Sequence, residues 1–191
     1  MNLKGNITVS DRIDFDIANR IAIELLKSHK KTNKKLGFYI CLILTTGLRI
    51  SDALTLTHEA IEKGYYELRE KKTSKAKRYD FSLSLIAIYN KYYLKGEGLL
   101  FANNSGTKAI SNSFINRKLK EIFHNSDLNI SSHSLRKAFG YNLYQLSSNK
   151  TEALYQLSEI YNHSSPKTTK IYIGVRTEEL QEVINKNILR F

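Results

Sequence analysis

The segment from residue 45 to residue 54 reads Thr45-Thr46-Gly47-Leu48-Arg49-Ile50-Ser51-Asp52-Ala53-Leu54. It follows an apolar run over 36–44, which predicts a buried helix that ends near Gly47, and a short helix is expected to begin near Ser51. Arg49 therefore lies at a helix junction, beside amide groups that would help a guanidinium bind a phosphate. The ordinary alternative is an arginine that caps the preceding helix or pairs with Asp52.

The rest of the chain predicts mostly helix around one hairpin. Ile17, Ile21 and Leu25 recur at four-residue spacing and predict an amphipathic helix over 14–27, followed by a basic polar loop over 27–35. Alternating residues predict a β-hairpin with strands at 65–69 and 79–83. Further helices are predicted at 84–94, 111–124, 133–147, 151–161, 165–172 and 176–188. The expected class is α+β, a mainly α-helical domain with a small antiparallel β-hairpin.

Composition restricts the setting and the partners. The 191 residues suit one domain, 1–191, and a formal charge of +12 favours a polyanion, with DNA or RNA first. Cys41 is the only cysteine, so it forms no internal disulfide, and its apolar neighbours predict a buried position. No apolar stretch approaches the roughly 20 residues that cross a bilayer. We expect a cytoplasmic protein with no membrane partner, no metal site and no cofactor.

Three other segments carry polar residues in chemically useful patterns. The hairpin tip, 71–78, is a basic run that could enter a DNA groove, although most such runs are only solvated. Residues 132–139 place His133 and Arg136 three positions apart, on one face of a helix. Residues 161–172 place His163 before a Ser-Ser-Pro helix start and Tyr172 nine positions later. Taken singly, each pattern is more often a surface feature than a site.

In chain order, the arginine, the lysines, the His-x-x-Arg pair, the second histidine and the tyrosine resemble the tyrosine recombinase, or phage integrase, family. Three boxes carry the resemblance: Thr-Gly-Leu-Arg-Ile-Ser at 46–51, His-Ser-Leu-Arg-Lys at 133–137, and His-Ser-Ser-x-x-Thr-Thr-x-x-Tyr at 163–172. The resemblance covers essentially the whole chain from about Ile7.

By matching position, the resemblance implies a catalytic set with Tyr172 as the nucleophile, together with Arg49, His133, Arg136 and His163. The catalytic lysine matches Lys72 best, with Lys75 and Lys71 as alternatives. Two guanidiniums would bind the non-bridging oxygens of the phosphate, His133 would accept the phenol proton, and Lys72 would protonate the departing 5′-oxygen. The remaining cations are predicted to bind DNA: Lys71, Lys75, Lys77, Arg78 and Lys137.

One departure from the family pattern is visible. Leu-Gly usually precedes the second histidine, whereas this chain has Tyr161-Asn162. The substitution changes the turn between two predicted helices and therefore bears on where His163 lies.

The resemblance also implies partners. They are double-stranded DNA and further copies of the chain, in a tetrameric synapse. The 176–188 helix either packs on its own core or is donated to a neighbouring subunit, as is the habit of the family. The chain is expected to lack the N-terminal core-binding domain, like the short recombinases that invert fimbrial switches, and to be encoded by a bacterium, a phage or a mobile element.

Two rival functions share these features. A type IB topoisomerase-like enzyme would use the same nicking chemistry but relax DNA without pairing sites. A non-catalytic, DNA-binding remnant of an integrase would keep the fold, although a binder needs no nucleophile. DNA integration, excision, inversion and dimer resolution all fit the recombinase reading.

Overall fold

The structure, a computed structural model, describes residues 10–69, 76–92, 96–124 and 126–175. The described elements are α1 (Phe15–Lys27), α2 (Lys31–Thr46), α3 (Ile50–Ala53), α4 (His58–Lys63), β1 (Tyr65–Arg69), β2 (Ala76–Asp80), α5 (Leu83–Tyr92), α6 (Asn112–Ile122), α7 (Ser132–Leu146), α8 (Lys150–Tyr161) and α9 (Pro166–Tyr172). The predicted α+β class is confirmed. The predicted 176–188 helix lies outside the described residues.

Helix α1 packs on α2 through small residues. Ala18, Ala22 and Leu26 are fully buried, whereas Ile17 is 44% exposed. A Cβ at Gly37 of α2 would lie 2.6 Å from the Ala22 carbonyl oxygen, so the two helices approach closely only where side chains are small. The amphipathic helix is confirmed. Its fully buried residues each lie one position after the predicted Ile17, Ile21 and Leu25.

Helix α2 is the centre of the main core. It begins at Lys31, so the loop before it is shorter than the predicted 27–35. Its first turn is polar, and apolar periodicity detects only the part that is buried, residues 36–44. Gly47 ends α2 as predicted, in the left-handed conformation with φ of 63°. A side chain at this position would also collide with the Phe139 ring.

The hairpin forms with a shifted second strand. The predicted strand at 79–83 is wrong, because the antiparallel ladder with β1 ends at Asp80. The Phe81 amide donates to the Gly64 carbonyl instead (2.8 Å), and Ser82 Oγ accepts from the Leu85 amide (3.3 Å) at the start of α5. The apolar alternation therefore continues past the strand into the next turn.

Helix α4 was not predicted. Thr57 Oγ1 accepts from the Ala60 amide (3.2 Å) at its start, and Gly64 ends it with φ of 81°. The helix has six residues, too few for a helical repeat of apolar positions to be visible in the sequence.

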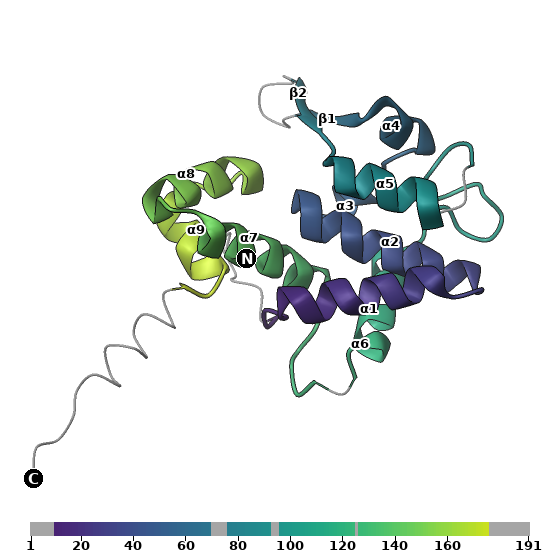
Figure 1. Cartoon of the computed structure of the whole chain (residues 1–191), viewed down its shortest axis with the longest axis horizontal. Helices are drawn as coiled ribbons and strands as arrows, with labels where there is room; N and C mark the ends of the chain where they lie inside the picture. Colours follow the sequence, from purple (N-terminus) through teal and green to yellow (C-terminus); the bar gives the residue numbers. More distant parts are fainter. Residues whose placement is uncertain (1–9, 70–75, 93–95, 125, 176–191) are drawn as a thin grey trace, which may run out of the picture.

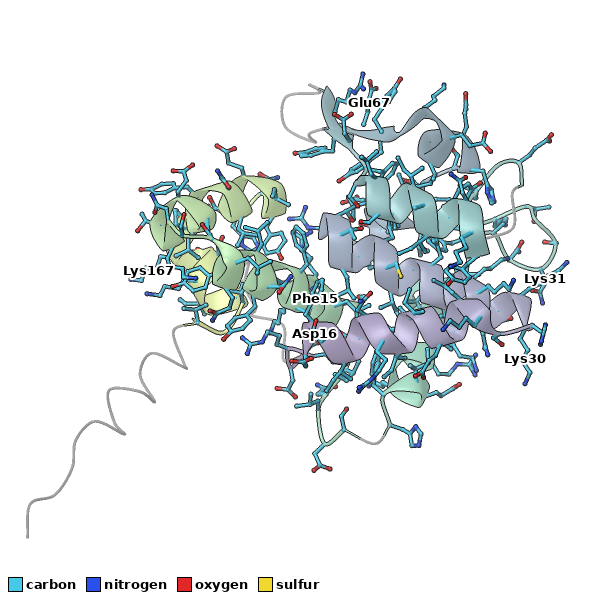
Figure 2. All side chains as sticks on the ribbon, in the orientation of Figure 1. Phe15, Asp16, Lys30, Lys31, Glu67 and Lys167 are labelled. Atoms are coloured by element: carbon cyan, nitrogen blue, oxygen red, sulfur yellow. The ribbon has the colours of Figure 1, made fainter. Side chains whose placement is uncertain are left out.

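Helix α7 joins the main core to a second cluster. Leu135 and Ala138 pack in the main core, while Phe139 and Leu143 lie against the second cluster. The buried members of that cluster come from α8 and from the residues just after α9: Leu157, Tyr161, Ile173 and Val175. Figure 1 shows α8 and α9 grouped together, with the carboxyl end of α2 directed toward them. In Figure 2, Lys30 and Lys31 mark the end of the molecule opposite Lys167 on α9.

From the sequence we expect four tyrosines to be packing residues, namely Tyr141, Tyr144, Tyr155 and Tyr161, and three of them pack against this second cluster. Tyr161 is fully buried, and Tyr141 and Tyr144 are partly buried against the cluster. Tyr155 is 56% exposed, so the prediction for it is wrong. It lies on α8, two positions from the buried Leu157 and therefore on another face of that helix.

Gly140 of α7 is required for the approach of α8 and α9. A Cβ there would collide with the Tyr161 hydroxyl and lie 2.9 Å from Ile173 Cγ2. We expect Gly140→Ala to lower the free energy of unfolding by about 1–3 kcal/mol, in spite of the better helix propensity of alanine. Urea denaturation measures the change. Adding Tyr161→Phe should recover part of the loss, and an alanine variant as stable as the parent would contradict this packing.

Candidate active site

Arg49 is the N-cap residue of α3, and its side chain is exposed. Its Nη2 donates to the carbonyl oxygen of Tyr161 at 2.7 Å. Tyr161 is the last residue of α8, where free carbonyl groups carry partial negative charge and favour a cation. The guanidinium therefore caps a helix that is distant in the sequence, rather than α2, and this contact does not involve Asp52.

Arg136 is buried, with 4% of its surface exposed. Its Nη1 donates to the Gly47 carbonyl, and its Nη2 donates to the Tyr161 carbonyl at 3.2 Å. Its guanidinium carbon also lies 4.0 Å from the centre of the Tyr161 ring. The end of α2 and the end of α8 thus hold this side chain from two directions.

The two arginines therefore converge on one oxygen. Arg49 comes from the junction after α2 and Arg136 from α7, yet both donate to the carbonyl of Tyr161. Guanidiniums present several donors in a rigid plane, so each keeps further N–H groups for another acceptor. Two adjacent guanidiniums are suited to binding the non-bridging oxygens of one phosphate.

His133 and Tyr172 are in direct contact. The imidazole Nδ1 lies 3.2 Å from the phenol oxygen. His133 lies in the first turn of α7, where Ser131 Oγ accepts from its amide (3.1 Å) and Ser134 Oγ accepts from the Ser131 amide (3.0 Å). This capping box fixes the start of α7, and hence the face that His133 shares with Arg136.

His163 approaches the same tyrosine from the turn between α8 and α9. Asn162 adopts the left-handed conformation there, with φ of 51° and ψ of 50°, as the glycine of the family pattern would. His163 Nδ1 lies 3.0 Å from Thr169 Oγ1, and its ring centre lies 5.1 Å from that of Tyr172. The Tyr-Asn substitution therefore preserves the turn. The predicted start of α9 is confirmed, with Ser165 as N-cap before Pro166.

Burial and positive charge set the protonation of these groups. The pKa of His133 is lowered by burial first and then by Arg136, Lys137 and Arg49. The same causes, burial and then Arg136 and Arg49, lower the pKa of His163 to about 4. Both imidazoles are therefore neutral at neutral pH. Burial raises the pKa of Tyr172, against the opposing effect of Arg136 and Arg49, so the phenol keeps its proton until a base removes it.

The lowered pKa of His133 predicts the pH dependence of DNA cleavage. A general base must be neutral, so the rate rises with pH through its pKa and is then level. We expect the cleavage rate constant at subsaturating DNA to be level from about pH 8 to about pH 6.5 and to fall only below that, since unperturbed histidine titrates near 6.5. His133→Gln should remove this dependence, whereas His124→Gln, at an exposed histidine, should keep it. A decline that begins above about pH 7 would contradict His133 as the base.

Two of the five predicted lysines, Lys77 and Lys137, lie in the described part of the chain. Lys71, Lys72 and Lys75 lie outside the described residues, and the catalytic lysine stays a prediction. Lys77 lies on β2, opposite Leu68. The other two predicted DNA-binding cations are Arg78 and Lys137, and they differ sharply in exposure.

Arg78 is exposed on β2. It donates to Asp80 Oδ1 at 3.1 Å and lies 3.9 Å over the Tyr65 ring. Lys137 is buried, with 8% of its surface exposed, and its ammonium donates to the Ser10 carbonyl at 2.5 Å. It therefore does not lie on the open surface that the prediction of a DNA contact supposed.

Sequence reasoning missed the central place of Tyr161. Its ring lies 5.4 Å from the Tyr172 ring and 5.2 Å from the His163 ring, and its hydroxyl donates to the Arg136 carbonyl at 2.5 Å. The available signal is the departure from Leu-Gly, but from the sequence alone it indicates only a changed turn. Thr169, fully buried against His163, was visible only as part of the Thr-Thr pair in the third box.

The described part of the chain holds neither a metal-binding cluster nor a membrane-spanning helix. Among these residues no three histidine, cysteine or acidic side chains are grouped so as to hold a metal ion. None of the described helices is both long and apolar enough to cross a membrane. Cys41 is buried as predicted, and burial raises the pKa of its thiol to about 12.

The fold and the cluster define a class of protein that known sequences also identify. The pattern of the phage integrase family matches residues 11–179, and the chain belongs to this family of tyrosine recombinases. It is 34% identical over 147 residues to the probable integrase/recombinase YoeC of Bacillus subtilis (strain 168). That alignment covers 75% of this chain and 79% of YoeC.

Solved structures share the fold. XerA recombinase matches with a TM-score of 0.65 at 16% identity, over 100% of this chain and 68% of that one. XerH recombinase bound to its palindromic difH substrate gives 0.63 at 21% identity, over 96% and 55%. The catalytic domain of bacteriophage HP1 integrase gives 0.57 at 22% identity, over 93% of this chain and 95% of that domain.

Proposed function

We propose that this protein is a site-specific DNA recombinase that cleaves and rejoins DNA through a covalent 3′-phosphotyrosine on Tyr172. The observation that carries the proposal is the contact of Tyr172 with the neutral His133, 3.2 Å apart, beside two convergent guanidiniums. A nucleophile, a base and a site for the developing negative charge are the parts that phosphoryl transfer needs.

The proposed step begins when a DNA phosphate draws Arg49 and Arg136 into contact with its non-bridging oxygens. A phosphate is a charged and therefore stronger acceptor than the carbonyl oxygens that hold both side chains in the described state. The phenol oxygen of Tyr172 bonds to phosphorus as its proton passes to His133. The bond from phosphorus to the 5′-oxygen breaks, and that oxygen takes a proton from Lys72. Because the phosphotyrosine keeps the ester linkage, rejoining needs no nucleotide cofactor.

Double-stranded DNA as substrate rests on charge and on the relatives. The chain carries +12 overall, which favours a polyanion. XerH and the Tn1549 integrase were both solved with DNA. We infer that four copies assemble on two sites, with the 176–188 segment as one contact between copies, and that the protein acts in the cytoplasm.

Nicked duplexes from the neighbourhood of the gene provide the test, because a nick near the cleavage point lets the short product diffuse away and traps the protein on DNA. We expect an adduct that survives denaturant and that forms only on duplexes carrying the target site. Binding without any adduct would support the non-catalytic reading and contradict the proposal. Relaxation of supercoiled plasmids that lack the site would support a topoisomerase-like enzyme instead.

A further inference from the structure

The first described residues pass directly beside the candidate nucleophile. Ser10, Asp11 and Arg12, here called the N-terminal brace, are anchored next to the start of α7. The Asp11 amide donates to the Asn129 carbonyl (3.1 Å), and Asp11 Oδ2 accepts from the Asn129 amide (2.7 Å). Ser10 Oγ lies 2.6 Å from Ser131 Oγ, the N-cap of α7. The brace is thereby fixed to the segment that leads into His133.

The Ser10 end of the brace holds the buried ammonium of Lys137 next to the ring of Tyr172. The Ser10 carbonyl accepts from Lys137 Nζ at 2.5 Å. That ammonium lies 5.5 Å from the centre of the Tyr172 ring, close enough for a cation–π attraction. Burial lowers the pKa of Lys137, and Asp11 opposes this by favouring the ammonium form, while Arg12 lowers the pKa further. The contact therefore links the brace to the ring of Tyr172 through one side chain.

The Arg12 end of the brace holds the backbone immediately after the nucleophile. Arg12 Nη1 donates to the Ile173 carbonyl at 3.1 Å, and its guanidinium carbon lies 3.3 Å over the Tyr141 ring of α7. Ile173 is the C-cap residue of α9, where an arginine donor satisfies a carbonyl that the helix leaves free. Arg12 thus ties the end of α9 to the face of α7.

We propose that the brace positions Tyr172 for attack, with Arg12 and Lys137 as positioning residues that hold the end of α9 and the phenol ring against α7. This inference rests on the proposed role of Tyr172 as nucleophile. Helix α9 has seven residues, too few to be stable alone, so contacts with the rest of the chain set the direction of its last side chain. In-line attack requires the phenol oxygen of Tyr172 to be placed within a fraction of an ångström of its position opposite the leaving oxygen.

The decisive test compares Arg12→Ala with Arg20→Ala, which removes the same charge from an exposed position on α1. Rates of adduct formation are measured in single turnover at saturating nicked DNA, and affinity is measured separately. We expect Arg12→Ala to slow adduct formation by about 10- to 100-fold, with a Kd equal to that of Arg20→Ala. Arg12→Lys, which keeps a cationic donor for the Ile173 carbonyl, should recover most of the rate. Equal rates for the two alanine variants would overturn the inference, as would an Arg12→Lys protein as slow as Arg12→Ala.

Lys137→Met separates positioning from DNA binding. If Lys137 acts through Tyr172, the variant lowers the rate at saturating DNA and leaves Kd and its salt dependence unchanged. A weaker Kd with a shallower salt dependence would mean that Lys137 leaves the brace to contact a phosphate, and would overturn its positioning role.

Hydrogen exchange in the absence of DNA tests the inference without relying on catalysis. We expect Arg12→Ala to accelerate exchange at the amides of Ile173 and Gly174, which close the end of α9, and to leave α8 unchanged. Unchanged exchange at α9 would overturn the brace even if the variant were slow. A wild-type protein that forms no adduct on any duplex would instead contradict the proposed function, while the exchange result would still report on the brace.

Discussion

Tyr172→Phe is expected to form no covalent adduct with any nicked duplex, a loss of about 10⁴-fold or more, because removal of a nucleophile leaves only the contribution of substrate binding. The change removes one oxygen and keeps the ring. The Tyr172 ring packs edge-on against those of Tyr161 and His163, and these contacts do not need the hydroxyl. Binding of DNA should therefore be unaffected, and stability should change by less than about 1.5 kcal/mol, the upper range for one neutral hydrogen bond.

Tyr155→Phe is the matched control for this variant. Tyr155 is exposed on α8. Removal of its phenol oxygen should therefore leave adduct formation at the parental rate. Measurement of adduct on denaturing gels, with DNA affinity measured in parallel, separates chemistry from binding. An adduct that persists in Tyr172→Phe at the parental rate would assign the attack to another residue.

Arg136→Lys is expected to lower the rate of adduct formation by about 100- to 1000-fold, the usual loss when one donor to a developing oxyanion is removed. The guanidinium donates to the carbonyls of Gly47 and Tyr161 at once, which fixes its plane. A lysine has the same charge but no rigid fork, so it cannot bind those carbonyls and a phosphate with the same geometry. The loss should appear in the rate at saturating DNA more than in Kd.

Two measurements keep the interpretation of Arg136→Lys clear. Arg117→Lys, at an exposed position on α6, makes the same substitution away from the cluster and should leave the rate unchanged. Thermal unfolding shows whether the buried site tolerates lysine, since an unsatisfied buried carbonyl costs about 1–3 kcal/mol. A folded Arg136→Lys protein with the parental rate would contradict the proposed role of this arginine.

Features set by local chemistry were predictable from the sequence. Gly47 ends α2 because glycine adopts positive φ freely, and Ser165 with Pro166 begins α9 because both residue types suit a helix start. The three-residue spacing of His133 and Arg136 was enough to place both on one face of α7, and the fold shows that this face meets α8 and α9. These signals act over a few residues, so they do not depend on the rest of the fold.

Features set by packing between distant segments were not predictable in the same way. The buried face of α1 is set by its close approach to Gly37 on α2. The end of β2 is set by the hydrogen bond from the Phe81 amide to the Gly64 carbonyl. Arg49 was expected at helix amides, but it donates to the carbonyl of Tyr161, 112 positions away in the chain. Pairings of this kind become visible only when the whole chain is folded.

Lys137 is another residue whose contacts are set by distant segments and could not be predicted from local sequence. Lys137 follows Arg136 directly in a family box, and its sequence position suggested a DNA contact. In the fold its ammonium instead donates to the Ser10 carbonyl and lies near the Tyr172 ring. Lys77 and Arg78 lie on β2 as cations of the hairpin, and their binding to DNA stays a prediction.

Identification of the residue joined to DNA tests the central claim most directly. The trapped adduct formed by the unmodified protein would be digested with protease and nuclease, and the nucleotide-bearing peptide sequenced by mass spectrometry. The proposed mechanism predicts a single modified peptide that contains Tyr172 and carries a phosphate-linked 3′-nucleotide on that residue. Attachment at any other residue, Tyr161 and Tyr141 included, would contradict it.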